Sequence, residues 1–178
     1  MDQRDDGTDD EITVTCQVNG VEVRLTGSPA RPASLALREL GLFSVRETCG
    51  LGICGTCTVR LDGEPVSTCI LPLYGLDGCR VETAEGLAGD GRLNPLQERF
   101  IESQAFQCSF CTPGFLMSGQ AMIEAAQGPL SGELIEEGLD GHLCRCGCYV
   151  AIKEALSSCA AGRACGDGEL DESEANVR

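Results

Sequence analysis

Apolar and polar residues alternate along the first part of the chain. Residues 12–18 read ITVTCQV and residues 21–25 read VEVRL, so every second residue is apolar. This two-residue period is typical of a half-buried β-strand. The dipeptide Asn19-Gly20 between the two runs favours a tight hairpin turn. The pattern therefore predicts a β-hairpin, and the inner face of its first strand carries Ile12, Val14, Cys16 and Val18.

Further strands and one helix are expected before residue 84. Ser34 can cap a short helix over residues 35–40, and Gly41 can end it. Three more strands are predicted at residues 56–61 (TCTVRL), 65–70 (PVSTCI) and 79–83 (CRVET), the first two joined by an Asp62-Gly63 turn. The first half of the chain therefore combines a sheet with a helix.

The pattern changes to a helical period after a glycine-rich stretch at residues 85–94, which we interpret as a linker. Helix-start signals are present at Asn94-Pro95, Thr112-Pro113 and Ser131. The predicted helices span residues 96–106, 114–126, 133–139 and 149–159. The sequence thus predicts an α+β chain with a sheet domain at 12–84 and a helical domain at 95–162.

Negative charge is concentrated at the two ends of the chain. The 178 residues carry a net charge of −15, and residues 1–11 alone contain six acids and one arginine. Such segments are typically solvated, so we predict a disordered acidic N-terminus (1–11) and an acidic C-terminal tail (163–178). The charge argues against nucleic acid as a partner. No apolar run is long enough to span a membrane and the acidic start is unlike a leader peptide, so we expect a cytoplasmic protein.

Thirteen cysteines and a single histidine define the chemistry that the chain can support. An odd number of cysteines with no export signal argues against a disulfide framework. Bound metal is the leading explanation, because thiolates are the ligands of iron–sulfur clusters and of structural zinc. A Rieske-type centre is excluded because it requires two histidines.

The first candidate metal site is the segment CGLGICGTCTV together with one later cysteine. The spacing Cys49-x4-Cys54-x2-Cys57-x11-Cys69 is that of a plant-type 2Fe–2S ferredoxin loop. The glycines in this loop can take positive φ and direct backbone N–H groups at an anionic cluster. Structural zinc is the alternative, but it is usually held by two short cysteine pairs. The spacing therefore favours a 2Fe–2S cluster.

The second candidate metal site combines two short motifs in the helical half. Cys108-x2-Cys111 ends one predicted helix and starts the next, and Cys144-x-Cys146 lies just before the last helix. Helix N-termini present positive dipole ends, which suit an anionic cluster. Spacing alone leaves both iron and zinc open at this site.

Three motifs in this order, CGLGICGTCTV with Cys69, QCSFCTPG and GHLCRCGCYVAI, resemble the iron–sulfur subunit of the molybdenum hydroxylases, the family of xanthine dehydrogenase. The resemblance covers roughly residues 12–160. It implies a β-grasp ferredoxin-like domain followed by a four-helix domain, each with one 2Fe–2S cluster. It also implies that Gln107 contacts the pterin of the molybdenum cofactor and that the Cys146 side of the second cluster faces this cofactor.

The same resemblance implies a function for the whole chain. It would be the electron-transfer subunit of an oxidoreductase and not catalytic alone. It would pass electrons from a molybdenum–pterin centre in a large subunit, through its two clusters, to FAD in a medium subunit or to another acceptor. The pterin is expected in its cytosine dinucleotide form, and the assembly is expected to be a hetero-oligomer, with a dimer of heterotrimers as one arrangement. The alternatives are a free-standing two-cluster ferredoxin and a zinc-stabilised interaction module.

The chain departs from the family pattern at four positions near the second site. Where the family usually has Gly, Asn, Thr and Gly, this sequence has Ser109, His142, Gly147 and Cys148. We expect His142 to form hydrogen bonds in its turn rather than to bind metal. We expect Cys148 to be a buried bystander, while an alternative ligand or a redox-sensitive thiol stays open.

Four cysteines lie outside both candidate sites. Cys16 and Cys159 fall on apolar stripes and are predicted to be small core residues. Cys79 and Cys165 lie near a turn and in the acidic tail, and no chemistry is assigned to them.

Overall fold

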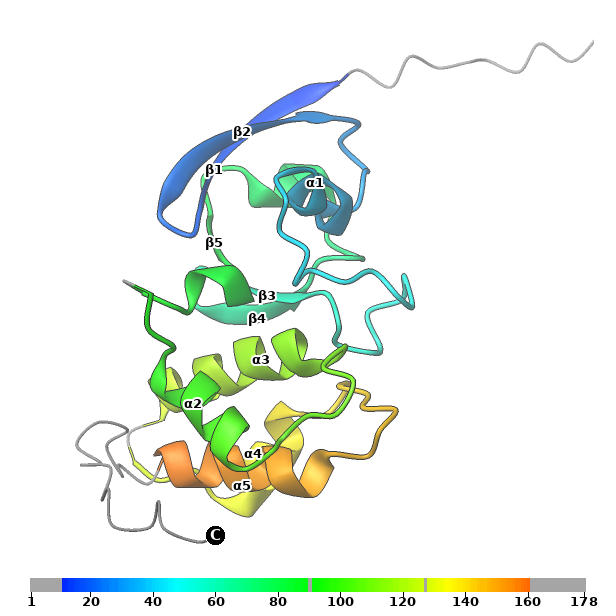
Figure 1. The fold of residues 1–178 in the computed structure, drawn as a ribbon. Helices are drawn as coiled ribbons and strands as arrows, with labels where there is room; N and C mark the ends of the chain where they lie inside the picture. The colour runs from blue at the N-terminus through cyan, green and yellow to red at the C-terminus, as the bar shows by residue number, and fades with distance from the viewer. Residues whose placement is uncertain (1–10, 90, 127, 161–178) are drawn as a thin grey trace, which may run out of the picture.

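The computed structural model describes residues 11–89, 91–126 and 128–160. It confirms the α+β class: a sheet half is followed along the chain by a helical half (Figure 1). The predicted acidic tail and Cys165 lie outside the described residues, as does the predicted acidic N-terminus apart from Glu11. None of the helices formed by the described residues is both long enough and apolar enough to traverse a lipid bilayer.

The sheet half contains one mixed five-stranded sheet. Its order is β2-β1-β5-β3-β4, and β1 and β5 run parallel while the other neighbours run antiparallel. The strands are β1 (Ile12–Val18), β2 (Val21–Gly27), β3 (Thr58–Leu61), β4 (Glu64–Ser67) and β5 (Arg80–Glu82).

The predicted first hairpin is present in the structure. Strands β1 and β2 pair from Ile12 opposite Gly27 to Val18 opposite Val21. Asn19 and Gly20 both have positive φ, 50° and 81°, as a tight turn of this kind requires. The inner face of β1 is buried at Val14, Cys16 and Val18 in the core of the sheet half, which confirms Cys16 as a core residue.

Helix α1 (Ala33–Glu39) covers this core, but the prediction of its cap was wrong. The residue at the N-cap is Pro32, and no side chain caps the helix. Ser34 lies one residue inside the helix, where it is fully buried and its hydroxyl donates to Glu47 at 2.5 Å. A hydroxyl in the first turn can serve a distant acceptor as well as its own helix, and here the tertiary partner prevails.

The helical half contains α2 (Pro95–Glu102), α3 (Thr112–Ala125), α4 (Gly132–Gly138) and α5 (Tyr149–Ala160). Two of the predicted starts are confirmed by their caps. Asn94 forms a reciprocal capping box with Gln97. Ser131 accepts a hydrogen bond from Leu134 N at 3.2 Å. The core of this half gathers around Phe100, Phe115, Ile152 and Leu156, and Cys159 packs against it as expected.

Helix α2 is shorter than predicted. The expected helix over residues 96–106 ends at Glu102. Gln104 has a φ of +48°, and Ala105 N donates back to Phe100 O at 2.9 Å. The left-handed conformation of Gln104 turns the chain so that the next N–H group bonds a carbonyl of the last helical turn, which is a common way for a helix to end. Residues 103–111 are therefore a loop, and Cys108 lies in it rather than at a helix end.

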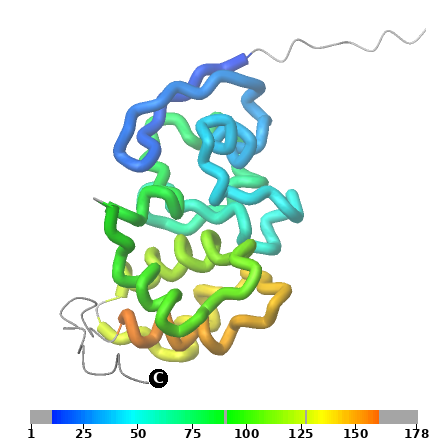
Figure 2. The backbone as a smooth tube through the Cα atoms, in the orientation of Figure 1, coloured from blue at the N-terminus to red at the C-terminus, as the bar shows by residue number. Residues whose placement is uncertain are grey.

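The two halves are packed against each other. Helix α3 lies directly below β3 and β4 (Figures 1 and 2). Arg60 of β3 forms ion pairs with Glu82 and, across the boundary, with Glu124 of α3. In the connecting stretch, between the short 3-10 helix η2 (Ala84–Gly86) and α2, Gly89 and Arg92 pair through their backbones. A second 3-10 helix, η1 (Leu73–Leu76), lies in the sheet half.

Candidate iron–sulfur sites

The first site is built on a loop between α1 and β3 whose backbone takes positive φ at three glycines. Gly50, Gly52 and Gly55 have φ values of 62°, 73° and 71°. This left-handed region is costly for other residues. It lets the loop curl inward, and Leu51 N points at Cys49 Sγ at 3.4 Å. The predicted role of the glycines in exposing backbone N–H groups is thus visible at Cys49.

A hairpin brings the fourth cysteine back to this loop. Strands β3 and β4 pair antiparallel, and Cys69 follows directly after β4. Thr68 holds the end of this hairpin beside the loop, because its hydroxyl donates to Cys57 O at 2.7 Å. The thiols interact in two pairs, Cys49 with Cys54 and Cys57 with Cys69, and the Cys69 thiol also lies within electrostatic range of Cys49. The structure therefore brings together all four cysteines of the first motif.

The acidity of these thiols differs across the first site. Backbone N–H groups, above all that of Leu51, lower the pKa of Cys49 to about 6. Burial, with the neighbouring Cys57 thiol, raises the pKa of Cys69 to about 12. A hydrogen bond to sulfur favours thiolate, whereas burial and a neighbouring negative charge disfavour it. Four neighbouring sulfurs, two of which face backbone N–H donors, fit a group that is cationic at its metals and anionic overall.

The second site is assembled from two segments that are far apart in the sequence. Cys108 and Cys111 come from the loop before α3, and Cys144 and Cys146 come from the turn before α5. Their thiols interact in crossed pairs, Cys108 with Cys146 and Cys111 with Cys144. The packing of α3 against α5 thus joins the two predicted motifs into one set of four thiols.

The electrostatics of the second site repeat those of the first. The N–H group of Phe110 lowers the pKa of Cys108, while burial and the neighbouring Cys144 raise the pKa of Cys111 to about 12. Burial opposes ionisation of Cys144, but hydrogen bonds led by Cys148 N–H outweigh it and lower its pKa. Each site therefore contains at least one sulfur that favours the thiolate and at least one that resists it.

Three of the residues that depart from the family pattern lie close to the second site, and the structure shows what each contacts or which conformation it takes. Ser109 has a φ of +59°, which explains why glycine is usual there and why this chain bears a small local strain. Cys148 is buried next to Cys144, and its N–H lies 3.4 Å from Cys144 Sγ. The backbone N–H of His142 bonds within its turn to Leu139 O, and its ring points out of the turn toward Ser118 of α3 and Thr58 of β3.

The thiols of each site are spread rather than tightly convergent. Within residues 11–89, 91–126 and 128–160, no three Cys, His, Asp or Glu side chains approach closely enough to chelate one metal ion. The pairwise interactions described above nevertheless connect all four thiols in each set. The two observations are compatible, since four ligands around a cluster of several atoms lie farther apart than four ligands around an ion.

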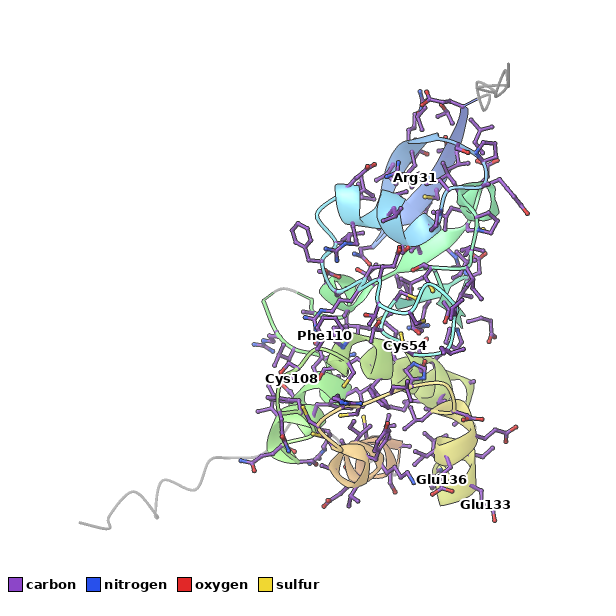
Figure 3. All side chains as sticks on the ribbon, turned by 90° about the vertical axis from the view of Figure 1, so that its right-hand side faces the viewer. Arg31, Cys54, Cys108, Phe110, Glu133 and Glu136 are labelled. Carbon is purple, nitrogen blue, oxygen red and sulfur yellow. The ribbon has the colours of Figure 1, made fainter. Side chains whose placement is uncertain are left out.

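The two sites lie near the boundary between the halves. Figure 3 shows Cys54, Cys108 and Phe110 in this middle zone, and Glu133 and Glu136 at the far end of the helical half. Leu143 N, next to Cys144, donates to Cys54 O at 3.1 Å. A backbone hydrogen bond therefore joins the two sets of cysteines directly.

Arg46 makes a second bridge between the sites that the sequence did not indicate. It lies three residues before Cys49, and its guanidinium donates to Ser109 O at 2.8 Å and to Phe110 O. It also lies over the Phe110 ring, 4.9 Å from the centroid. No motif marks this arginine, since its partners are backbone carbonyls and a ring 64 residues away.

Gln107 and its neighbours form an exposed edge beside the second site. Gln107 and Cys108 are exposed, Phe110 is 46% exposed, and Cys146 is partly buried. Arg38, Phe43, Arg46 and Glu47 complete a shallow hollow with Cys108 and Phe110. The residues predicted to meet the molybdenum cofactor are thus accessible in this chain.

Two sets of four thiols on a ferredoxin-like sheet and a helical unit define an iron–sulfur protein of the electron-transfer class. Known domains match both halves. Residues 16–88 match the 2Fe-2S iron-sulfur cluster binding domain, and residues 83–157 match the [2Fe-2S] binding domain. These matches favour iron over the zinc alternative.

Individual proteins with similar sequences or structures show to which family of iron–sulfur proteins the chain is related. The chain is 40% identical over 149 residues to the xanthine dehydrogenase iron-sulfur-binding subunit of Escherichia coli O157:H7, covering 83% of this chain and 94% of that one. It is 37% identical over 155 residues to the nicotinate dehydrogenase small FeS subunit of Eubacterium barkeri, covering 84% and 98%. A chain of quinoline 2-oxidoreductase from Pseudomonas putida 86 has the same fold, with a TM-score of 0.77, 34% identity and coverage of 83% and 91%.

The chain therefore belongs to the family of 2Fe–2S iron–sulfur subunits of the molybdenum hydroxylases, the xanthine dehydrogenase family. It is an electron-transfer component of a molybdenum-containing oxidoreductase. The relatives are subunits of larger enzymes, so the free-standing ferredoxin gains no support from them.

Proposed function

We propose that this chain carries single electrons from a molybdenum–pterin centre in a large subunit to FAD in a medium subunit, through one 2Fe–2S cluster in each half. The observation that carries the proposal is the pairing of two four-thiol sets, joined by the hydrogen bond from Leu143 N to Cys54 O. When bound, the clusters supply reversible one-electron chemistry. The chain itself holds them, shields them and fixes the gap between them.

The proposed ligands follow from the thiols that the fold gathers. Those of the first cluster are Cys49, Cys54, Cys57 and Cys69. Those of the second cluster are Cys108, Cys111, Cys144 and Cys146. The proposed domains are a β-grasp unit at residues 12–84 and a four-helix unit at residues 95–162, with 85–94 as the connection. The sheet order and α2–α5 support this division.

The second site would face the large subunit. We propose that the Gln107 amide bonds the pterin and that the Cys146 side of the cluster lies nearest to it, because a carboxamide both donates and accepts, as a pterin edge requires. The exposure of Gln107 and Cys108 supports this interface. The cytosine dinucleotide form of the pterin is part of the same proposal.

The first site would face the FAD-binding subunit. Leu51, Ile53 and Ile70, around the first cysteine loop, are 69%, 57% and 61% exposed. Apolar side chains gathered at one loop are typical of a surface that a partner covers. We therefore propose a hetero-oligomer in which this chain lies between two larger subunits, with a dimer of heterotrimers as one arrangement. We also propose a cytoplasmic location, because the thiols that hold such clusters stay reduced in that compartment.

Metal analysis and co-purification test the proposal. Chain expressed with its neighbouring subunits should carry about four irons and about four sulfides, as two 2Fe–2S clusters require. Zinc in place of half of the iron would contradict a 2Fe–2S cluster at the second site. Isolation of the loaded chain without larger partners, under conditions that preserve complexes, would favour a free-standing ferredoxin.

The contact with the pterin has its own test. Gln107→Ala should keep the iron content but slow reduction of the clusters by substrate in the assembled enzyme, or weaken assembly. Gln104→Ala is a matched control, because Gln104 lies in the same loop three residues earlier. Equal reduction rates and equal assembly in both variants would remove Gln107 from the interface.

A further inference from the structure

His142 lies where the two halves of the molecule meet. It precedes Leu143 and the proposed ligand Cys144 of the second site, yet its ring packs against Gly55 of the first site. A Cβ atom added at Gly55 would lie 2.5 Å from Cδ2 of the ring, much closer than any real contact. The imidazole therefore occupies the space that a glycine at position 55 leaves open.

The ring is held by residues from two other elements. Its Nε2 lies 3.0 Å from Ser118 Oγ of α3 and 3.5 Å from Thr58 Oγ1 of β3. The Phe115 ring packs against it with a centroid separation of 5.1 Å. Ser118, Thr58 and Phe115 are all buried, so the ring packs against interior side chains rather than lying on the surface. Through this one side chain, the turn before α5 contacts both the sheet and α3.

Packing contributes more than hydrogen bonding to the position of the imidazole. Its Nδ1 is buried without a hydrogen-bond partner among the described residues. Because one nitrogen is anchored and the other is unpaired, the position of the ring is determined by shape at least as much as by polarity.

We propose that His142 is a positioning residue that sets the separation of the two cluster-binding segments. On one side its ring wedges against Gly55, between the proposed ligands Cys54 and Cys57. On the other side the next residue, Leu143, donates to Cys54 O at 3.1 Å. Side-chain packing and a backbone hydrogen bond thus fix the same junction, and small displacements there would carry the second site away from the first. This inference rests on the ligand sets proposed above.

The test is the magnetic interaction between the two clusters in the fully reduced chain, assembled with its partners. Two nearby paramagnetic clusters split each other's resonance, and the splitting falls as their separation grows. His142→Ala removes the ring that packs against Gly55 and should measurably reduce the splitting. His142→Phe keeps a ring of similar size without Nε2 and should retain it. Ser118→Ala removes only the best hydrogen-bond partner of the ring and should also retain it.

Iron and sulfide analysis of each protein separates this inference from the proposed function. If the natural sequence lacks one of the two clusters, the ligand sets are wrong. If it holds both and His142→Ala shows the natural splitting, the positioning role is wrong. If His142→Ala loses the second cluster, His142→Asn decides, since asparagine is too short to reach Gly55: a reduced splitting supports the role, and an unchanged splitting overturns it.

Discussion

The two cysteine sites reach similar chemistry by different routes. In the first, three cysteines lie within one loop and a hairpin returns the fourth, so the site is largely local. In the second, two pairs of cysteines from distant turns meet only after α3 and α5 have packed. Sites of the first kind depend on backbone conformation, and sites of the second kind depend on tertiary packing. The two should therefore respond differently to mutation.

Removal of a ligand should have the largest effect and should differ between the sites. Cys111→Ala is expected to abolish the second cluster and to loosen α3, because Cys111 directly precedes that helix and would tie its start to the cluster. Cys54→Ala is expected to abolish the first cluster and leave the helical half intact. Iron content and the paramagnetic spectrum of the reduced protein measure both losses. Cys79→Ala, outside both sets, should change neither.

A methyl group at the contact between the halves should have the next largest effect. A Cβ atom at Gly114 of α3 would lie 2.0 Å from Gly55 O, which is backbone and cannot move aside easily. We expect Gly114→Ala to destabilise the protein by about 2–4 kcal/mol, since it forces the halves apart. Gly132→Ala is the matched control, because nothing lies near its Cβ position. Thermal unfolding measures the loss of stability in both variants. Equal unfolding midpoints would show that the contact between Gly114 and Gly55 O adjusts easily to a methyl group.

The two ion pairs of Arg60, one of which crosses the boundary to α3, should contribute less. Arg60 has a side-chain exposure of 8% and faces Glu82 and Glu124, each about half exposed. Arg60→Ala leaves two facing carboxylates and is expected to cost about 1–3 kcal/mol. Arg80→Ala breaks an exposed pair with Asp62 at 3.6 Å and should cost about 0–1 kcal/mol. Denaturant unfolding measures the loss of stability in both variants. A larger loss for Arg80→Ala than for Arg60→Ala would contradict the prediction.

The smallest effect is expected at Cys148. Its thiol is buried beside Cys144, but the second set already holds four thiols without it. Cys148→Ser should leave the iron content and both paramagnetic signals unchanged. Loss of one signal would show instead that Cys148 is a ligand in place of Cys146.

The local features of the fold were predictable from sequence, and the long-range ones were not. Asn19-Gly20, Asn94 and Ser131 act on their own backbone neighbours, so their roles follow from nearby residues. Ser34 failed as a cap because its partner, Glu47, lies 13 residues away. The end of α2 was missed because glutamine rarely adopts the positive φ of Gln104.

The candidate sites divide in the same way. The spacing of the first motif was sufficient to favour a 2Fe–2S cluster, whereas at the second set only the family resemblance favoured iron over zinc. Arg46, Thr58 and Ser118 were not anticipated, because their contacts connect segments at least 63 residues apart or depend on the ring position of His142. A pattern of spacings contains no information on which loops meet after packing.

The contact of Gly55 with Gly114 also bears on how such subunits can be recombined. At this point two backbones touch with no side chain between them, so neither half can accommodate a larger residue unless the other retreats. A chimera that joins this sheet half to the helical half of a relative should load both clusters only if the donor also has glycine at the position of Gly114. The halves are therefore interchangeable only where the helical half keeps glycine at the position of Gly114, because the carbonyl oxygen that excludes a side chain there is present whatever residue stands at position 55.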